Sequence, residues 1–124
     1  MAWTRRTPLK RYRGFGRTKF GNIETFYGGI LFRSKLEANY AMWLDSEKRQ
    51  GRVKGWRYEV AIPLHTGNRK LIGAYIVDFV VRFLDGHEEF HEVKSKGTIT
   101  DLWRWKWKHS KLEYPNRVFK MIWG

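Results

Sequence analysis

The stretch that decides the fold is YIVDFVVRFLDGHEEFHEVKS, residues 75–95. Its first half is one of the most apolar runs in the chain and contains a single carboxylate, Asp78. Its second half carries Glu92 and Lys94 two residues apart, so on a strand both point to the same face. LDG (84–86) between the halves is a turn signal. The stretch therefore predicts a central β-hairpin with charged side chains inside it.

Two loop lengths are compatible with LDG, and they place the charges differently. A two-residue turn puts Asp78 and Glu92 on opposite faces of the hairpin. A three-residue loop, with Gly86 in its left-handed third position, sets Asp78 directly across from Glu92 at about 5 Å between Cβ atoms. Ile76 then falls opposite Lys94 on the same face. The three-residue loop is the one that gathers two acids and a lysine.

Two carboxylates this close favour a shared cation, because both ionise only at high cost without one. Carboxylate oxygens suit Mg²⁺ or Mn²⁺, and such an ion beside Lys94 would serve phosphodiester hydrolysis. A plainer interpretation stays open, in which Glu92 and Lys94 lie on a solvated edge and Asp78 pairs with Arg82. An unpaired carboxylate inside YIVDFVV would be costly, which speaks for a specific partner of Asp78.

The rest of the chain predicts a small α/β domain with a mixed sheet flanked by helices. Ser34 and Glu37 form a capping-box pattern at the start of the first helix, and Gly51 is a natural stop. The expected elements are a hairpin at 24–32, a helix at 34–51, strands at 55–64, 71–83 and 87–95, a helix at 101–114 and a strand at 117–123. Apart from the small hairpin, the order is helix, three antiparallel strands, helix, strand.

The charge balance indicates a polyanionic partner. The 124 residues contain 25 Lys and Arg against 12 Asp and Glu, a net charge of +13. Nucleic acid is the first candidate and a membrane surface the second. The absence of cysteine excludes disulfides and thiolate zinc sites. No long apolar stretch or signal peptide is evident, so we expect a cytoplasmic protein without a membrane segment.

Residues 1–20 carry seven basic residues and no acid. Such a block is typical of a tail that meets phosphates without reading sequence. We therefore expect a basic N-terminal tail, 1–20, followed by a single domain, 21–124.

Asp78 followed by Glu92-Val93-Lys94 resembles the motif of the PD-(D/E)XK nuclease superfamily, whose core has the same order of elements. FRSKLEANYAMWL (32–44) with GRVKGWRYEVAIPL (51–64) is similar to small phage-encoded members. Those have Gln-Pro where this chain has Glu59-Val60, so no role is carried over to residue 59. The resemblance covers about residues 20–123 and implies a restriction-endonuclease-like core.

The resemblance implies a metal-dependent nuclease site. Asp78, Glu92 and Glu37 would hold Mg²⁺ or Mn²⁺, and the catalytic residues would be Glu37, Asp78, Glu92 and Lys94. Glu37 has a second interpretation, as part of the helix cap. EVKSKG (92–97) also looks like the corresponding strand of archaeal Holliday-junction-resolving enzymes.

The expected function is therefore that of a Mg²⁺-dependent, structure-specific DNA endonuclease, most similar to a Holliday-junction resolvase and acting as a homodimer. A general, nicking or restriction-like nuclease shares the same motifs, and a catalytically silent DNA-binding or packaging protein is the alternative of another class. The expected DNA contacts are Arg5, Arg6, Lys10, Arg11, Arg13, Arg17, Lys35, Lys96, Lys106 and Lys108. We expect Trp103 and Trp107, on one face of the second helix, in the core or at a subunit interface.

Overall fold

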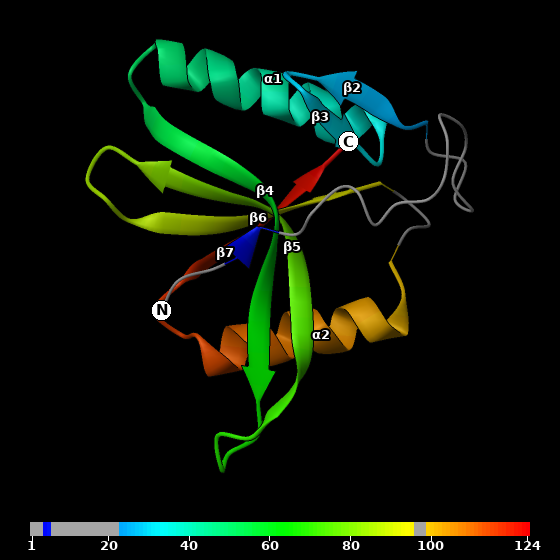
Figure 1. The fold of residues 1–124 in the computed structure, drawn as a ribbon. Helices are drawn as coiled ribbons and strands as arrows, with labels where there is room; N and C mark the ends of the chain where they lie inside the picture. The colour runs from blue at the N-terminus through cyan, green and yellow to red at the C-terminus, as the bar shows by residue number, and fades with distance from the viewer. Residues whose placement is uncertain (1–3, 6–22, 96–98) are drawn as a thin grey trace.

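The computed structural model describes residues 4–5, 23–95 and 99–124. Two helices, a mixed sheet and a small separate hairpin make up this part of the chain (Figure 1). In chain order the elements are β1 (Thr4–Arg5), β2 (Thr25–Tyr27), β3 (Ile30–Phe32), α1 (Lys35–Arg49), β4 (Val53–His65), β5 (Leu71–Phe83), β6 (Glu88–Lys94), α2 (Asp101–Glu113) and β7 (Val118–Trp123). The expected small α/β fold is confirmed.

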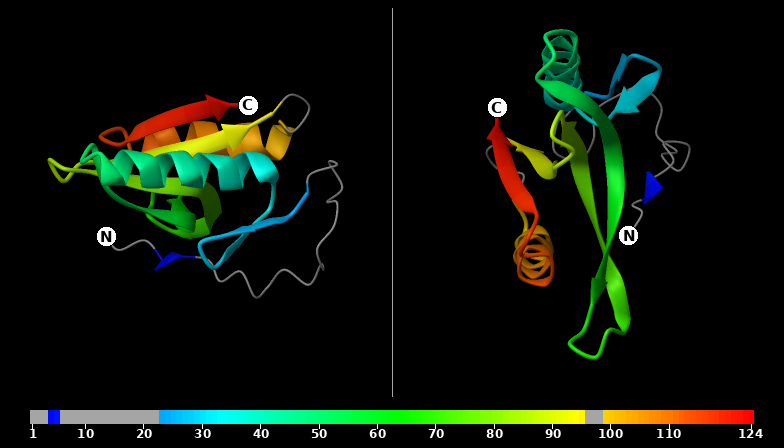
Figure 2. Two further views of the ribbon diagram at one scale, coloured as in Figure 1. Left: turned by 90° about the horizontal axis from the view of Figure 1, so that it is seen from above. Right: turned by 90° about the vertical axis from the view of Figure 1, so that its left-hand side faces the viewer.

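The sheet has the strand order β1-β4-β5-β6-β7. All neighbours are antiparallel except β6 and β7, which are parallel because α2 carries the chain back between them. Helix α1 and the β2–β3 hairpin lie on one side of the sheet and α2 on the other, and the long β4–β5 ribbon is strongly twisted (Figures 1 and 2). No helix within the described residues has the length and apolar character to span a membrane.

Both helices begin at side-chain caps. The Ser34 hydroxyl accepts a hydrogen bond from the Glu37 amide at the start of α1, and Thr100 accepts one from the Trp103 amide at the start of α2. Gly51, with φ of +78°, follows the end of α1. The first cap and the glycine stop were predicted from sequence.

The turn between β5 and β6 is the three-residue loop Leu84-Asp85-Gly86. The Phe83 amide donates to the His87 carbonyl at 3.0 Å, and Gly86 has φ of +91°. The predicted register is confirmed from Arg82↔Glu88 to Phe79↔His91, where the ladder ends. Asp78 and Glu92 follow immediately, one on each strand, so they lie where β5 and β6 separate.

Replacing Gly86 with Ala is expected to lower the free energy of unfolding by about 1–2 kcal/mol, because a Cβ disfavours the left-handed conformation. Urea denaturation measures the change. The matched control is Gly67→Ala, in an exposed turn without positive φ and with open space around the added Cβ. Equal stability of the two variants would show that the loop relaxes to another conformation.

The hydrophobic core is divided into two clusters. Tyr58 and Phe79 pack with α1, whereas Val60 and Val77 belong to the cluster that packs against α2. Residues two apart on a regular strand face the same side, so the strands reverse their faces between these pairs. The reversal falls at Glu59, which has a left-handed φ of +54°.

One strand was not predicted. Thr4 and Arg5 pair with Ala61 and Val60 at the β4 edge of the sheet. This places part of the expected basic tail against the domain. The sequence of these two residues carries no strand pattern, and their pairing depends on the exposed edge that β4 offers.

Candidate functional site

Four carboxylates from four different elements are buried together near the end of the β5–β6 ladder. They have exposed fractions between 1% and 7%. Burial of so many acids requires compensating partners, because a buried unpaired carboxylate is costly. We call this set the acid cluster, and its members are Glu37 of α1, Glu59 of β4, Asp78 of β5 and Glu92 of β6.

Arg33 lies among three of these acids. Its Nη2 is 2.7 Å from Asp78 Oδ1 and 3.6 Å from Glu37 Oε2, and its Nε is 3.7 Å from Glu59 Oε2. Burial by itself would lower the pKa of Arg33, but the charges of Glu37 and Asp78 outweigh it and raise the pKa. The guanidinium is therefore the resident cation of the cluster. Sequence reasoning did not identify it.

Asp78 is held from both sides. Its Oδ2 accepts a hydrogen bond of 2.9 Å from the Val93 amide, and its Oδ1 contacts Arg33. The Asp78 side chain therefore binds a backbone N–H group of β6 that lies just beyond the last paired residues of β5 and β6. Arg82, the partner considered from sequence, instead pairs with Glu88 at 3.3 Å.

Glu37 combines the two roles considered for it. Its amide donates to Ser34 in the helix cap, while its carboxylate accepts a hydrogen bond from the Tyr58 hydroxyl and pairs with Arg33. The cap fixes the first turn of α1 and so directs this side chain toward β4. Serving as a capping residue therefore does not remove Glu37 from the cluster.

Glu92 is a buried carboxyl group of the cluster whose pKa is strongly raised. Burial and the nearby charge of Asp78 raise its pKa to about 8, although Tyr75 donates a hydrogen bond to Oε1 and Lys94 lies 3.4 Å from Oε2. A carboxyl group that resists ionisation in this way is poised for an additional cation. Tyr75 is the β5 side chain that hydrogen-bonds to Glu92, and the expected pairing of Ile76 with Lys94 lies beyond the end of the β5–β6 ladder.

Lys94 is fixed from several directions. Its Nζ lies 4.6 Å from the centroid of the Trp103 ring, and its backbone pairs with β7 at Trp123. Cation–π contact orients an ammonium group without neutralising it. Trp103 and Trp107 pack against the α2-side core, as predicted, and Trp103 additionally supports the lysine.

Glu59 occupies the position to which the resemblance gave no role. It is almost fully buried, faces Arg33 and has the left-handed φ that reverses the strand. A non-glycine residue in that conformation costs about 1–2 kcal/mol and is often found at functional sites. No sequence pattern indicates this conformation, since a polar Glu between Tyr58 and Val60 fits the alternation of apolar and polar residues in an ordinary strand.

The chemistry of the cluster suits a hard divalent cation. All four acids offer carboxylate oxygens, the ligands of Mg²⁺ and Mn²⁺, and the Arg33 guanidinium already occupies a cationic position among them. Within the described residues, no group of three or more His, Asp or Glu side chains stands ready to hold a metal ion. Arg33 lies between the carboxylates of Glu37 and Asp78, two of the three acids expected to hold a metal.

The expected DNA contacts are only partly described. Lys35 and Lys108 are exposed and Lys106 is half-buried, while Arg5 is placed by its backbone in β1. Arg6, Lys10, Arg11, Arg13, Arg17 and Lys96 lie outside the described residues.

A second buried polar group is separate from the acid cluster. His91 lies between Tyr40 of α1, at 2.6 Å, and Glu89, at 2.9 Å. Burial would raise the pKa of Glu89, but hydrogen bonds from His91 and His87 lower it. Burial lowers the pKa of His91. This group joins α1 to β6 and has no contact with Arg33.

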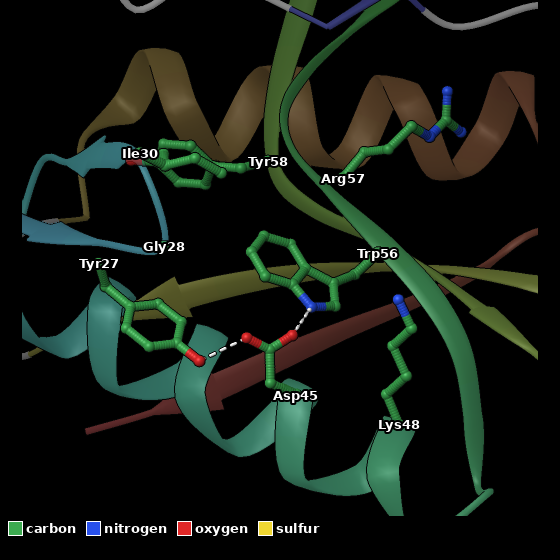
Figure 3. A pocket seen from close by; sticks show the side chains of 8 residues that line it. All are labelled: Tyr27, Gly28, Ile30, Asp45, Lys48, Trp56, Arg57 and Tyr58. Carbon is green, nitrogen blue, oxygen red and sulfur yellow. Dashed lines mark hydrogen bonds between the residues drawn. The ribbon is translucent and has the colours of Figure 1, made fainter.

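A pocket of about 300 Å³ opens between the β2–β3 hairpin, α1 and β4 (Figure 3). Asp45 lies at its base and accepts hydrogen bonds from the Tyr27 hydroxyl and from Trp56 Nε1, the latter at 2.8 Å. Tyr58 lines the pocket and also donates to Glu37, so it connects this pocket to the acid cluster. Lys48 and Arg57 supply positive charge to its lining.

Comparison with known proteins identifies the family of this chain. No curated protein and no solved structure matches the sequence. One family model matches residues 17–123, which include the whole acid cluster, Arg33 and Lys94. The chain therefore belongs to the family described as "Protein of unknown function (DUF1064)".

Proposed function

We propose that this protein is a Mg²⁺-dependent DNA endonuclease with a restriction-endonuclease-like core. The observation that carries the proposal is the acid cluster, in which Asp78 and Glu37 are buried around Arg33 and the buried Glu92 pairs with Lys94. Buried oxygen ligands adjoining a fixed ammonium group are what metal-assisted phosphodiester hydrolysis requires.

The arrangement of elements supports the same assignment. Helix α1, the antiparallel strands β4, β5 and β6, helix α2 and the parallel strand β7 follow the order of the PD-(D/E)XK core. Asp78 lies on β5, and Glu92 and Lys94 lie on β6, as in that motif.

In this proposal Asp78, Glu92 and Glu37 would hold the metal, and its chemistry there would be polarisation of a phosphate oxygen and a lowered pKa of water. Tyr75 keeps Glu92 oriented through its hydrogen bond. Lys94, held 3.4 Å from Glu92 and over Trp103, places positive charge where the phosphate gains negative charge. Hydrolysis breaks one P–O bond of the backbone and leaves a phosphomonoester and a hydroxyl end.

The preferred substrate in this proposal is branched DNA such as a Holliday junction. The net charge of +13 supplies affinity for phosphates without sequence readout. Resolution of a junction needs two symmetric cuts, so the active form would be a two-fold homodimer. A general, nicking or restriction-like nuclease would use the same site and would differ only in the DNA that it prefers.

The alternative is a catalytically silent DNA-binding or packaging protein. The Arg33–Asp78 contact favours it, because an arginine in place of a metal is a plausible end state of a site that has lost catalysis. The retention of Lys94 beside Glu92 favours the enzyme, since a DNA-binding role has no need of it.

One assay separates these functions. The purified protein is incubated with a four-way junction and with a linear duplex of the same sequence, each with Mg²⁺ or with EDTA. We expect Mg²⁺-dependent cutting, faster on the junction. Absence of metal-dependent cutting of both DNAs contradicts the enzyme, while equal cutting of both contradicts only the preference for junctions.

A further inference from the structure

We infer that Arg33 is an exchangeable counter-ion of the acid cluster, which occupies the site of the divalent cation and must leave it before the metal binds. The inference rests on the proposed metal site and adds a means of regulating it. Its starting point is that one guanidinium meets three buried carboxylates, from α1, β4 and β5.

The contacts of Arg33 are uneven. The pair with Asp78, at 2.7 Å, is a close hydrogen bond and Tyr58 is a further hydrogen-bond partner, whereas the distances to Glu37 and Glu59 are 3.6 and 3.7 Å. Nε is buried and donates no hydrogen bond within the part of the chain that the structure describes. A permanent structural arginine normally uses its planar donors in pairs, so this one is held mainly by charge.

The position of Arg33 permits exchange. Its backbone is fixed by a hydrogen bond of 3.2 Å from its amide to the Tyr58 hydroxyl, between the end of β3 and the cap of α1. Its side chain nevertheless has an exposed fraction of 41%, whereas that of Asp78 is 1%. Part of the side chain therefore already borders solvent, and this is the side toward which the guanidinium would leave in our inference.

Charge explains why a divalent ion would displace it. Arg33 and Lys94 bring two positive charges to the four buried acids. A divalent cation among the same oxygens supplies one more charge than the arginine does. The released guanidinium would then lie beside the metal, where the phosphate of a DNA substrate is expected.

The test is the binding of Mn²⁺ alone, followed by calorimetry and by the rise in melting temperature, in the wild type and in Arg33→Met. We expect Arg33→Met to bind Mn²⁺ about tenfold more tightly, because the metal no longer competes with a buried ion pair. Arg82→Met is the matched control, since Arg82 pairs with Glu88 outside the cluster, and its Mn²⁺ affinity should equal that of the wild type.

The outcomes distinguish this inference from the proposed function. Mn²⁺ binding by the wild type with equal or weaker binding by Arg33→Met overturns the counter-ion role alone. Failure of Mn²⁺ to bind any of the three proteins overturns the metal site and the counter-ion role together.

A second measurement uses the wild type, in case Arg33→Met does not fold. Arginine Nε–H signals are recorded by NMR with and without diamagnetic Mg²⁺. We expect the Arg33 signal to become mobile on the ps–ns timescale when Mg²⁺ is added, while the Arg82 signal does not change. An Arg33 signal that stays rigid at saturating Mg²⁺ overturns the inference.

Discussion

Replacing Asp78 with Asn is expected to reduce DNA cleavage by at least about a thousandfold, because each 1.36 kcal/mol of lost transition-state stabilisation lowers the rate about tenfold. Asn keeps an oxygen for the Val93 amide but loses the charge that faces Arg33. In the proposed site the metal would bind to this negatively charged carboxylate. Cleavage of a labelled junction in Mg²⁺, measured at saturating enzyme, gives the rate.

DNA binding should survive this substitution. The proposed affinity comes from basic residues, and Asp78 is almost fully buried, so binding of a junction in Ca²⁺ or EDTA should change less than about threefold. Glu89→Gln is the matched control, a buried acid of the same sheet that contacts His91 rather than Arg33, and it should retain cleavage. Equal loss in both variants would point to damaged folding, and loss of binding by Asp78→Asn would contradict the separation of binding from chemistry.

Replacing Glu92 with Gln is expected to stabilise the metal-free protein at pH 8 by an amount on the order of 3 kcal/mol, at about 1.4 kcal/mol for each pH unit of pKa change. The folded protein keeps the proton of Glu92 up to about pH 8, whereas the ordinary pKa of a free Glu is 4.5. Between these values the unfolded chain binds fewer protons, so wild-type stability falls as pH rises. Gln preserves an acceptor for Tyr75 and removes this titration.

Urea denaturation in EDTA at pH 5, 6, 7 and 8 measures this effect. The wild type should lose stability across the series relative to Glu92→Gln. Glu89→Gln should show the opposite sign at pH 8, because its hydrogen-bonded carboxylate has a lowered pKa and stabilises the fold above pH 4.5. A Glu92→Gln protein that is less stable than wild type at pH 8 would mean that the ionised Glu92–Lys94 pair outweighs the cost of burial.

The hairpin and its acids were predictable because local rules determine them. LDG allowed two loop lengths, each with its own register, and the structure has the three-residue loop with Gly86 in the left-handed third position. The register then brings Asp78 and Glu92 to the same end of the ladder. Helix ends followed in the same way from Ser34 and Gly51.

The partners of the acids were not predictable by the same means. Arg33 reaches Asp78 across 45 positions of sequence, and Tyr75 reaches Glu92 only because the strands reverse their faces at Glu59. Both contacts depend on the twist of the sheet and on the left-handed backbone conformation at residue 59. A glutamate at that position does not indicate such a conformation. The chain has many basic residues, and no local sequence pattern singles out Arg33 as the one that pairs with the acids.

The reversal at Glu59 places the acid cluster where the β4–β5 ribbon passes from one core to the other. On one side of it Tyr58 and Phe79 pack with α1, and on the other Val60 and Val77 belong to the cluster that packs against α2. At this crossing point the acids are buried without taking the place of an apolar side chain in either core.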